Sequence, residues 1–250
     1  MNIVVLTALG VGGATVIGAL IGFAFKKLSH KFSDIILSFA AGVMLAAAVF
    51  GLIIPSLEYG GRNSVFVTVA GIFCGAFVLN IIDRIVPHLH RMSGMDIEEH
   101  KANKTVNKVM LFVMAIAIHN LPEGIAAGVG FGTGNTAEAL TIAFGIALQN
   151  IPEGMVIIAP MIAAGVSKGR TLLIASLTGV VEVAGTFLGY FAVSLSGAIL
   201  PFALAFAGGT MLYVISDEMI PETHHNESLA VTYSFLLGFC LMLAMDFYLG

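Results

Sequence analysis

Two short stretches decide the fold of this chain, HNLPEG at residues 119–124 and QNIPEG at residues 149–154. Both follow the pattern N-x-P-E-G, and each lies inside an apolar run long enough to cross a bilayer. A carboxylate at membrane depth costs at least ~2.5–3.5 kcal/mol on insertion scales, so Glu123 and Glu153 are candidate functional residues. Each is preceded by a side chain that can bind a metal. We therefore predict a divalent-metal site inside a membrane protein.

Composition supports a membrane protein and excludes a soluble globular enzyme. The chain is 58% hydrophobic and 10% charged, with a mean hydropathy of +0.99, whereas soluble domains carry about 25% charged residues. A helical span needs ~20 apolar residues. Eight candidate spans cover residues 3–25, 34–57, 65–86, 108–131, 137–163, 171–194, 200–218 and 229–248. We expect an all-α polytopic protein in which residues 1–250 form one transmembrane domain, with the first span a retained helix rather than a signal peptide.

The lysines and arginines predict the orientation of the eight spans. All of them except Arg62 lie at the first, third and fifth links or at the adjoining helix ends. Basic residues favour the cytoplasmic side, so both termini are expected outside the cytoplasm. We predict a multi-pass protein of the plasma membrane, here the bacterial inner membrane.

An internal repeat relates the second span to the seventh. FAAGVML at residues 39–45 resembles FAGGTML at residues 206–212, and IIP at 53–55 resembles MIP at 219–221 with a one-residue shift. Because these spans run in opposite directions, the pattern predicts an inverted repeat of helices 1–3 and 6–8 around a central pair, a recurring plan in transporters. Chance similarity between helices rich in Gly, Ala and Met is the alternative.

The central pair of spans carries the ligand chemistry. His119 and Glu123 lie one turn apart on the same helix face, and Gln149 and Glu153 repeat that spacing. The prolines between them should kink both helices and free backbone carbonyls, which a membrane tolerates only beside protein or a water-filled cavity. Imidazole with carboxylates suits Zn²⁺ and other first-row divalent ions, and such an ion would offset the repulsion between the glutamates and displace a proton.

Amide side chains and a third carboxylate extend this cluster. Asn120 and Asn150 add amide oxygens next to the first ligand of each stretch. Glu182 stands near the middle of the sixth span with no basic residue nearby in sequence. It is most simply explained as a further ligand that bridges to a second metal ion. A lone buried His or Glu is usually a satisfied core group, and the duplication is what favours a metal site here.

A second polar group is expected where the third and seventh spans reach the cytoplasm. A relay that receives departing ions is one reading, and ordinary solvated helix ends are the other. The candidates for the relay are Asp83, His88, Asp217, Glu218, Glu222 and His224.

The paired stretches resemble the signature of the fourth and fifth helices of the ZIP (Zrt/Irt-like) metal transporter family. ISDEMIPETHH at residues 215–225 and the segment 83–88 resemble its prokaryotic GufA-type branch. The resemblance spans the whole chain and implies eight helices in a 3+2+3 arrangement with the termini outside. It also implies import of Zn²⁺, and variably of Fe²⁺, Mn²⁺ or Cd²⁺, by an elevator-like movement.

The resemblance further implies a binuclear site. One metal position would use His119, Glu123, Gln149 and Glu153, and its neighbour would use Asn120, Glu123, Asn150, Glu153 and Glu182. Some members carry a carboxylate where this chain has Asn150, and many eukaryotic members have His in place of Gln149. These departures should weaken the second position and blur selectivity.

We considered three other functions. Two of them fit the sequence less well than a metal importer, and the third differs from it only in the direction of transport. An intramembrane metalloprotease would need a string such as H-E-x-x-H, which the chain lacks. A non-transporting sensor would need a soluble output domain, for which eight spans leave no room. An exporter stays open, because the site does not fix the sign of the driving gradient. Expected partners are divalent metal ions and bilayer lipids, not nucleic acid, with a homodimer left open.

Overall fold

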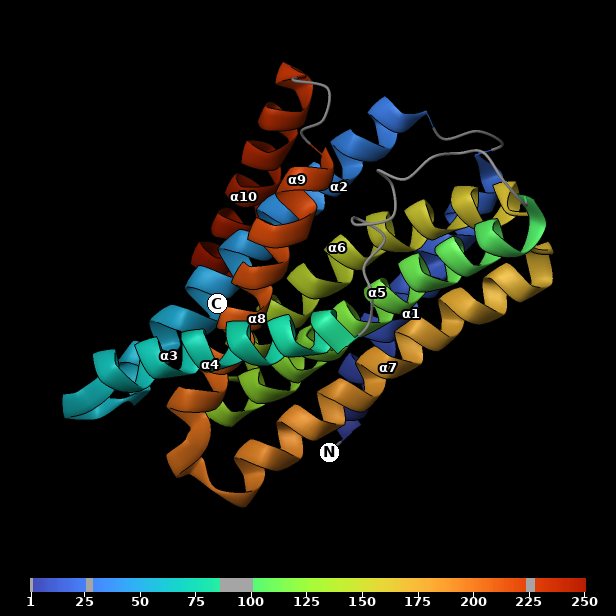
Figure 1. Ribbon diagram of the computed structural model, residues 1–250. Coiled ribbons are helices and arrows are strands. Elements are labelled where there is room, and N and C mark those ends of the chain that lie inside the picture. Colours follow the sequence, from blue (N-terminus) through green and yellow to red (C-terminus); the bar gives the residue numbers. More distant parts are fainter. Residues whose placement is uncertain (1, 26–28, 86–100, 224–227) are drawn as a thin grey trace.

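The computed structural model describes residues 2–25, 29–85, 101–223 and 228–250, in which every regular element is a helix (Figure 1). Two of the eight long spans are composite: α2 continues through a π-helical segment, Ala47–Ile53, into α3, and α8 continues through Ile215–Met219 into α9. The helices are α1 (Asn2–Ala24), α2 (His30–Ala46), α3 (Ile54–Tyr59), α4 (Ser64–Ile85), α5 (Lys101–Gly130), α6 (Thr136–Ala163), α7 (Lys168–Leu195), α8 (Leu200–Val214), α9 (Ile220–Thr223) and α10 (Leu229–Leu249).

Seven of these spans are long and apolar enough to cross a membrane, judged over the described residues. The eighth long helix is α5, which carries the HNLPEG stretch. The prediction of an all-helical polytopic membrane protein is therefore confirmed. Hydropathy marks only the apolar centre of a span, so the predicted and observed bounds differ most at the polar ends of the helices. The predicted spans 34–57, 108–131 and 200–218 extend in the structure over 30–59, 101–130 and 200–223.

A tight link explains why α5 and α6 are adjacent in space. After α5 the chain makes one 3₁₀ turn, Phe131–Thr133, and Gly134 then takes φ +79°, a left-handed conformation that glycine adopts without strain. The Asn135 side chain accepts hydrogen bonds from the backbone N–H groups of Ala137 and Glu138 and caps α6. A link this short returns α6 alongside α5 and brings the two N-x-P-E-G stretches together.

The π segments were not anticipated from the sequence. Each ends just before a proline, Pro55 or Pro221. Proline lacks an N–H and its ring clashes with the carbonyl four residues back, so the preceding turn widens to the i→i+5 pattern. Kinks were expected at Pro122 and Pro152. Both prolines lie inside helices that remain α-helical on either side of them. The irregular backbone thus lies in the second and seventh spans.

The helices pack as two groups. In one, α5 packs on α7 and α1 packs on α6 and α7; in the other, α4 packs on α8 and α10 packs on α2 (Figure 1). The groups meet mainly where α6 contacts α2 and where α5 contacts α8. Within the first group the backbones approach very closely: a Cβ on Gly124 would collide with the Glu182 carbonyl oxygen, and one on Gly154 with the Thr15 carbonyl oxygen. Such small-residue contacts are how helices associate in lipid.

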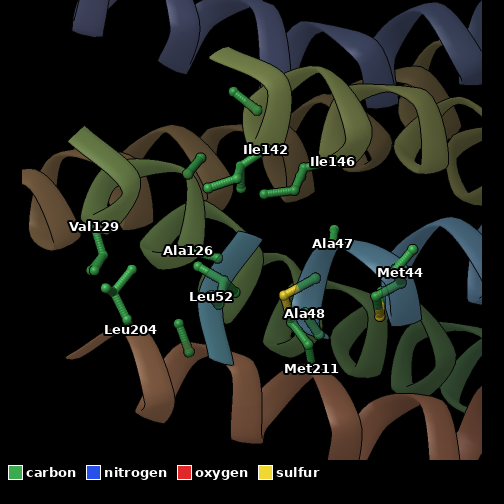
Figure 2. Close-up of a cluster of buried hydrophobic side chains, with 14 of the residues drawn as sticks. Met44, Ala47, Ala48, Leu52, Ala126, Val129, Ile142, Ile146, Leu204 and Met211 are labelled. Carbon is green, nitrogen blue, oxygen red and sulfur yellow. The ribbon is translucent and has the colours of Figure 1, made fainter. Parts of the chain in front are cut away.

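The main apolar core lies where the two groups meet. Met44, Leu52, Ile146 and Met211 converge there from α2, its π segment, α6 and α8, each at most 1% exposed (Figure 2). On the outside, α4 presents Phe66 at 80% exposure. An apolar side chain so exposed suits hydrocarbon as the surrounding medium. The core fixes α5 and α6 against the second group immediately beside the polar residues of the two stretches.

Candidate functional site

A cluster of polar side chains is buried at the centre of the first helix group. Three helices supply it, α5, α6 and α7, and most of its members have 2% or less of their surface exposed. Their exposures are His119 8%, Asn120 1%, Glu123 2%, Gln149 0%, Asn150 0% and Glu182 0%, while Glu153 is half-buried. Every central residue that the sequence nominated therefore lies in one buried region.

The carboxylates of the cluster are close enough to influence one another. Glu123 interacts electrostatically with Glu153 and with Glu182, and Glu153 interacts with His119. The side chain of Gln149 neighbours the Glu123 carboxylate, although no hydrogen bond of normal geometry joins them. Placing like charges together in a buried site is unfavourable unless a cation or proton intervenes. The arrangement therefore favours binding of a cation.

One part of the cluster has unused hydrogen-bonding capacity. Neither oxygen of Glu123, neither polar atom of the Asn120 amide and neither polar atom of the Gln149 amide has a hydrogen-bond partner among the described residues. Buried polar groups are nearly always hydrogen-bonded, and leaving them unpaired costs free energy. We call these three residues the open donors, because each holds an oxygen whose lone pairs are available for donation to a metal ion. Oxygens held in this way are ready to coordinate an ion.

The other part is hydrogen-bonded to protein, apart from Asn150 Oδ1. Asn150 Nδ2 donates to the Val11 carbonyl oxygen at 3.2 Å and also to Glu182 Oε1. Thr15 Oγ1 donates to Glu182 Oε2 at 3.4 Å. We call Asn150, Glu182, Thr15 and Val11 the clamp. It joins α6 and α7 to α1, a helix in which the sequence predicted no site residue.

Glu218, one of the relay candidates, lies directly beside the central cluster. Its Oε1 lies 2.8 Å from His119 Nε2, and its carboxylate also interacts with Glu153. The π segment Ile215–Met219 carries it, so the second helix group touches the cluster at this point. Of the other relay candidates, Asp217 and Glu222 are exposed, while the Asp83 side chain, His88 and His224 fall outside the described residues. The relay stays a prediction.

The cluster is not a closed ligand cage in this conformation. Among the described residues, no three His, Cys, Asp or Glu side chains converge in a geometry that would hold a metal ion. The predicted ligands also include three amide side chains, those of Asn120, Gln149 and Asn150. What the described residues form is a buried polar neighbourhood that unites open donors, the clamp and the His119–Glu218 pair.

Thr15 is the site residue that sequence reasoning missed, although a signal for it exists. It lies 167 residues before Glu182, its hydrogen-bonding partner. The repeated segments that begin at Phe39 and Phe206 are separated by the same interval. Extending the repeat from the second and seventh spans to the first and sixth would have paired Thr15 with Glu182. Val11 contributes only its carbonyl, and no side-chain pattern could have indicated it.

Comparison with known proteins gives concordant matches. The sequence model of the family described as "ZIP Zinc transporter" matches residues 88–246. The chain is 38% identical to "Zinc transporter GufA" of Myxococcus xanthus, covering 96% of both chains. It is 36% identical to "Zinc transporter ZIPB" of Bordetella bronchiseptica, covering 95% of this chain and 78% of that one. It is also 33% identical to "Zinc transporter ZupT" of Chlorobaculum parvum, over 94% and 92%.

Proposed function

We propose that this chain, which belongs to the ZIP zinc transporter family, carries Zn²⁺ across its membrane into the cytoplasm. The family consists of transporters, so the choice of a transporter over an enzyme is confirmed. The observation that carries the proposal is the set of open donors: Glu123, Asn120 and Gln149 hold unpaired oxygens in a buried cluster between membrane spans. An entering Zn²⁺ would supply the missing partner for such oxygens.

The finer proposal follows the predicted binuclear site. His119, Glu123, Gln149 and Glu153 would hold the first ion, and Asn120, Asn150 and Glu182 would join the two glutamates around a second. Among the open donors, Glu123 and Gln149 support the first position, and Asn120 with the shared Glu123 supports the second. The second position is the weaker one, since an amide stands at residue 150. Fe²⁺, Mn²⁺ and Cd²⁺ remain proposed alternative cargoes.

We propose alternating access by movement of one helix group against the other. Two observations support it. The groups are bridged by the His119–Glu218 pair at 2.8 Å, a polar contact that can break and re-form. An apolar cavity of about 330 Å³ also lies along their boundary, lined by Leu79 of α4, Leu121 and Pro122 of α5, Val181 of α7 and Phe206 of α8. A boundary that protein side chains leave partly unpacked resists sliding less than a fully packed one.

We propose the inverted repeat because helices at equivalent places in its two halves pack in the same way. A Cβ on Gly42 of α2 would collide with the Phe235 carbonyl oxygen of α10, and one on Gly209 of α8 would collide with the Ile72 carbonyl oxygen of α4. Gly42 and Gly209 hold the same place in the repeated segments. The same kind of contact therefore recurs in both halves. With the basic residues at alternate links, the repeat supports termini on the extracytoplasmic side.

Uptake of ⁶⁵Zn²⁺ into proteoliposomes tests the function. Wild type should accumulate the isotope, and the His119→Ala/Glu153→Ala double variant should not, at either of two external pH values. Glu58→Gln is the matched control, because Glu58 is an exposed carboxylate outside the cluster and its variant should transport like wild type. Uptake by the double variant at the wild-type rate would contradict the assignment of the site. A pH effect on wild type would open the question of proton coupling, because protonation of the ligands also weakens zinc binding.

A further inference from the structure

The clamp uses the same atoms that a second metal ion would need. Both oxygens of Glu182 already accept hydrogen bonds, Oε1 from Asn150 and Oε2 from Thr15. Both hydrogens of the Asn150 amide are engaged as well, one with Glu182 and one with the Val11 carbonyl. Glu123 and Gln149, by contrast, have no hydrogen-bond partner among the described residues. Asn120, a ligand of the second position, is unpaired as well. The clamp therefore engages two of the three ligands that belong to the second position alone, Asn150 and Glu182.

The chemistry of residue 150 fixes this difference. An amide can donate to a carboxylate, whereas an ionised carboxylate can only accept. An aspartate at position 150 would repel Glu182, and a cation between the two would remove that repulsion. Asn150 achieves the same result with a hydrogen bond and occupies one of the two lone pairs of Glu182 Oε1 in doing so. An amide nitrogen that carries its hydrogens is not a metal ligand, so only Asn150 Oδ1 remains available on that side chain.

We infer, on the basis of the proposed function, that the clamp outcompetes metal at the second position. This chain then binds one Zn²⁺ tightly, at the position built on His119, Glu123, Gln149 and Glu153, and a second ion at least about tenfold more weakly. Glu182 serves as a positioning residue: it ties α7 to α6 and, through Thr15, to α1. The three helices are held together by hydrogen bonds where a second ion would otherwise bridge them.

The test is the number of zinc ions per chain. Purified, metal-stripped protein in detergent is equilibrated by dialysis against a series of ⁶⁵Zn²⁺ concentrations, with size exclusion as the check on folding. Wild type should saturate at one ion before any second binding step. Asn150→Asp should bind two ions with affinities within tenfold of each other, because it removes the donor that occupies Glu182. Asn150→Asp combined with Glu182→Gln should return to one.

Matched variants separate the possible failures. Asn135→Asp adds the same carboxylate at the N-cap of α6, outside the cluster, where aspartate also caps a helix, and should leave the count at one. Two ions of similar affinity in wild type, or one ion in a folded Asn150→Asp variant, would overturn the inference. Failure of the proposed function would look different: wild type would bind no zinc, or binding would survive in His119→Ala/Glu153→Ala.

Discussion

The two N-x-P-E-G stretches share a backbone setting but differ in what their side chains do. In α5 and in α6 the glycine that closes the stretch packs against a carbonyl of a neighbouring helix, that of Glu182 in one case and Thr15 in the other. The asparagines diverge. Neither polar atom of the Asn120 amide has a hydrogen-bond partner among the described residues, whereas the Asn150 amide donates to two acceptors.

This difference separates a residue available to bind a metal ion, Asn120, from a residue that supports helix packing, Asn150. Asn120 and Glu123 of the α5 stretch, like Gln149 of the α6 stretch, hold buried oxygens that lack partners, a costly state that favours capture of an ion. The α6 stretch uses its asparagine to fix Glu182 and α1. Duplication of a sequence pattern has therefore kept the helix packing while the two asparagines have taken different roles. Substitutions can alter one copy and leave the other as an internal reference.

The largest effect is expected where the copies are alike. Gly124→Leu and Gly154→Leu should both abolish folded protein, because a Cβ at either position collides with backbone that cannot move aside. Gly10→Leu is the control, since nothing lies within 4 Å of a Cβ there. The measurement is the monodisperse yield after extraction in detergent. Normal yield from only one of the two variants would show that the matched packing is not equivalent.

Glu123→Ala should reduce ⁶⁵Zn²⁺ uptake to background while leaving the folded protein extractable. The Glu123 oxygens have no hydrogen-bond partner among the described residues, so their removal breaks no protein hydrogen bond and relieves repulsion with Glu153 and Glu182. We expect the unfolding temperature to stay level or to rise. Uptake in proteoliposomes and thermal unfolding are measured on the same preparation. Near-normal uptake would contradict the central-site proposal.

Exchanging the first ligand of each copy should shift zinc affinity in opposite directions. His119→Gln makes the α5 stretch begin like the α6 stretch and should weaken zinc binding by about tenfold, or ~1.4 kcal/mol. Gln149→His makes the reverse exchange and should strengthen it, because imidazole is a better zinc ligand than an amide. Equilibrium dialysis measures both. Unchanged affinity in the two variants would place the ion away from residues 119 and 149.

Glu182→Ala should have the smallest effect on transport and a measurable effect on stability. Uptake should fall several-fold without being lost, since Glu182 positions helices and does not hold the first ion. Stability should fall by ~1–3 kcal/mol, because the buried Asn150 amide loses an acceptor. Denaturant unfolding in mixed micelles and uptake are compared with those of Glu123→Ala. An equal loss of uptake in both variants would mean that the division between binding and support is wrong.

The fold was predictable because its determinants are local in sequence. The length of each apolar run indicates a span regardless of context, and the spacing of His119 and Glu123 indicates a shared helix face. The arrangement of Asn150 was not predictable in this way. Whether its amide donates to Glu182 or offers its oxygen to an ion depends on Val11 and Thr15, which lie far away in the chain.

The position of Glu218 likewise depends on residues that are far from it in the sequence. Its sequence context pointed to a helix end, and that reading placed it in a cytoplasmic relay. The π segment Ile215–Met219 brings its carboxylate beside His119, a contact that the sequence did not indicate, and the relay stays a prediction. Local widening of a helical turn before a proline changes the direction of side chains in a way that an α-helical projection does not capture.

The π segments also account for the one-residue shift within the sequence repeat. Between Met44 and Pro55 the chain has one residue more than between Met211 and Pro221, and the π segment of the first copy is the longer, seven residues against five. A turn closed by i→i+5 bonds holds an additional residue without rotating the remainder of the span. The second span can therefore absorb an insertion or lose it again by deletion. The same change in α6 would turn Glu153 away from its partners, so length variation is permitted in one span and forbidden in the other.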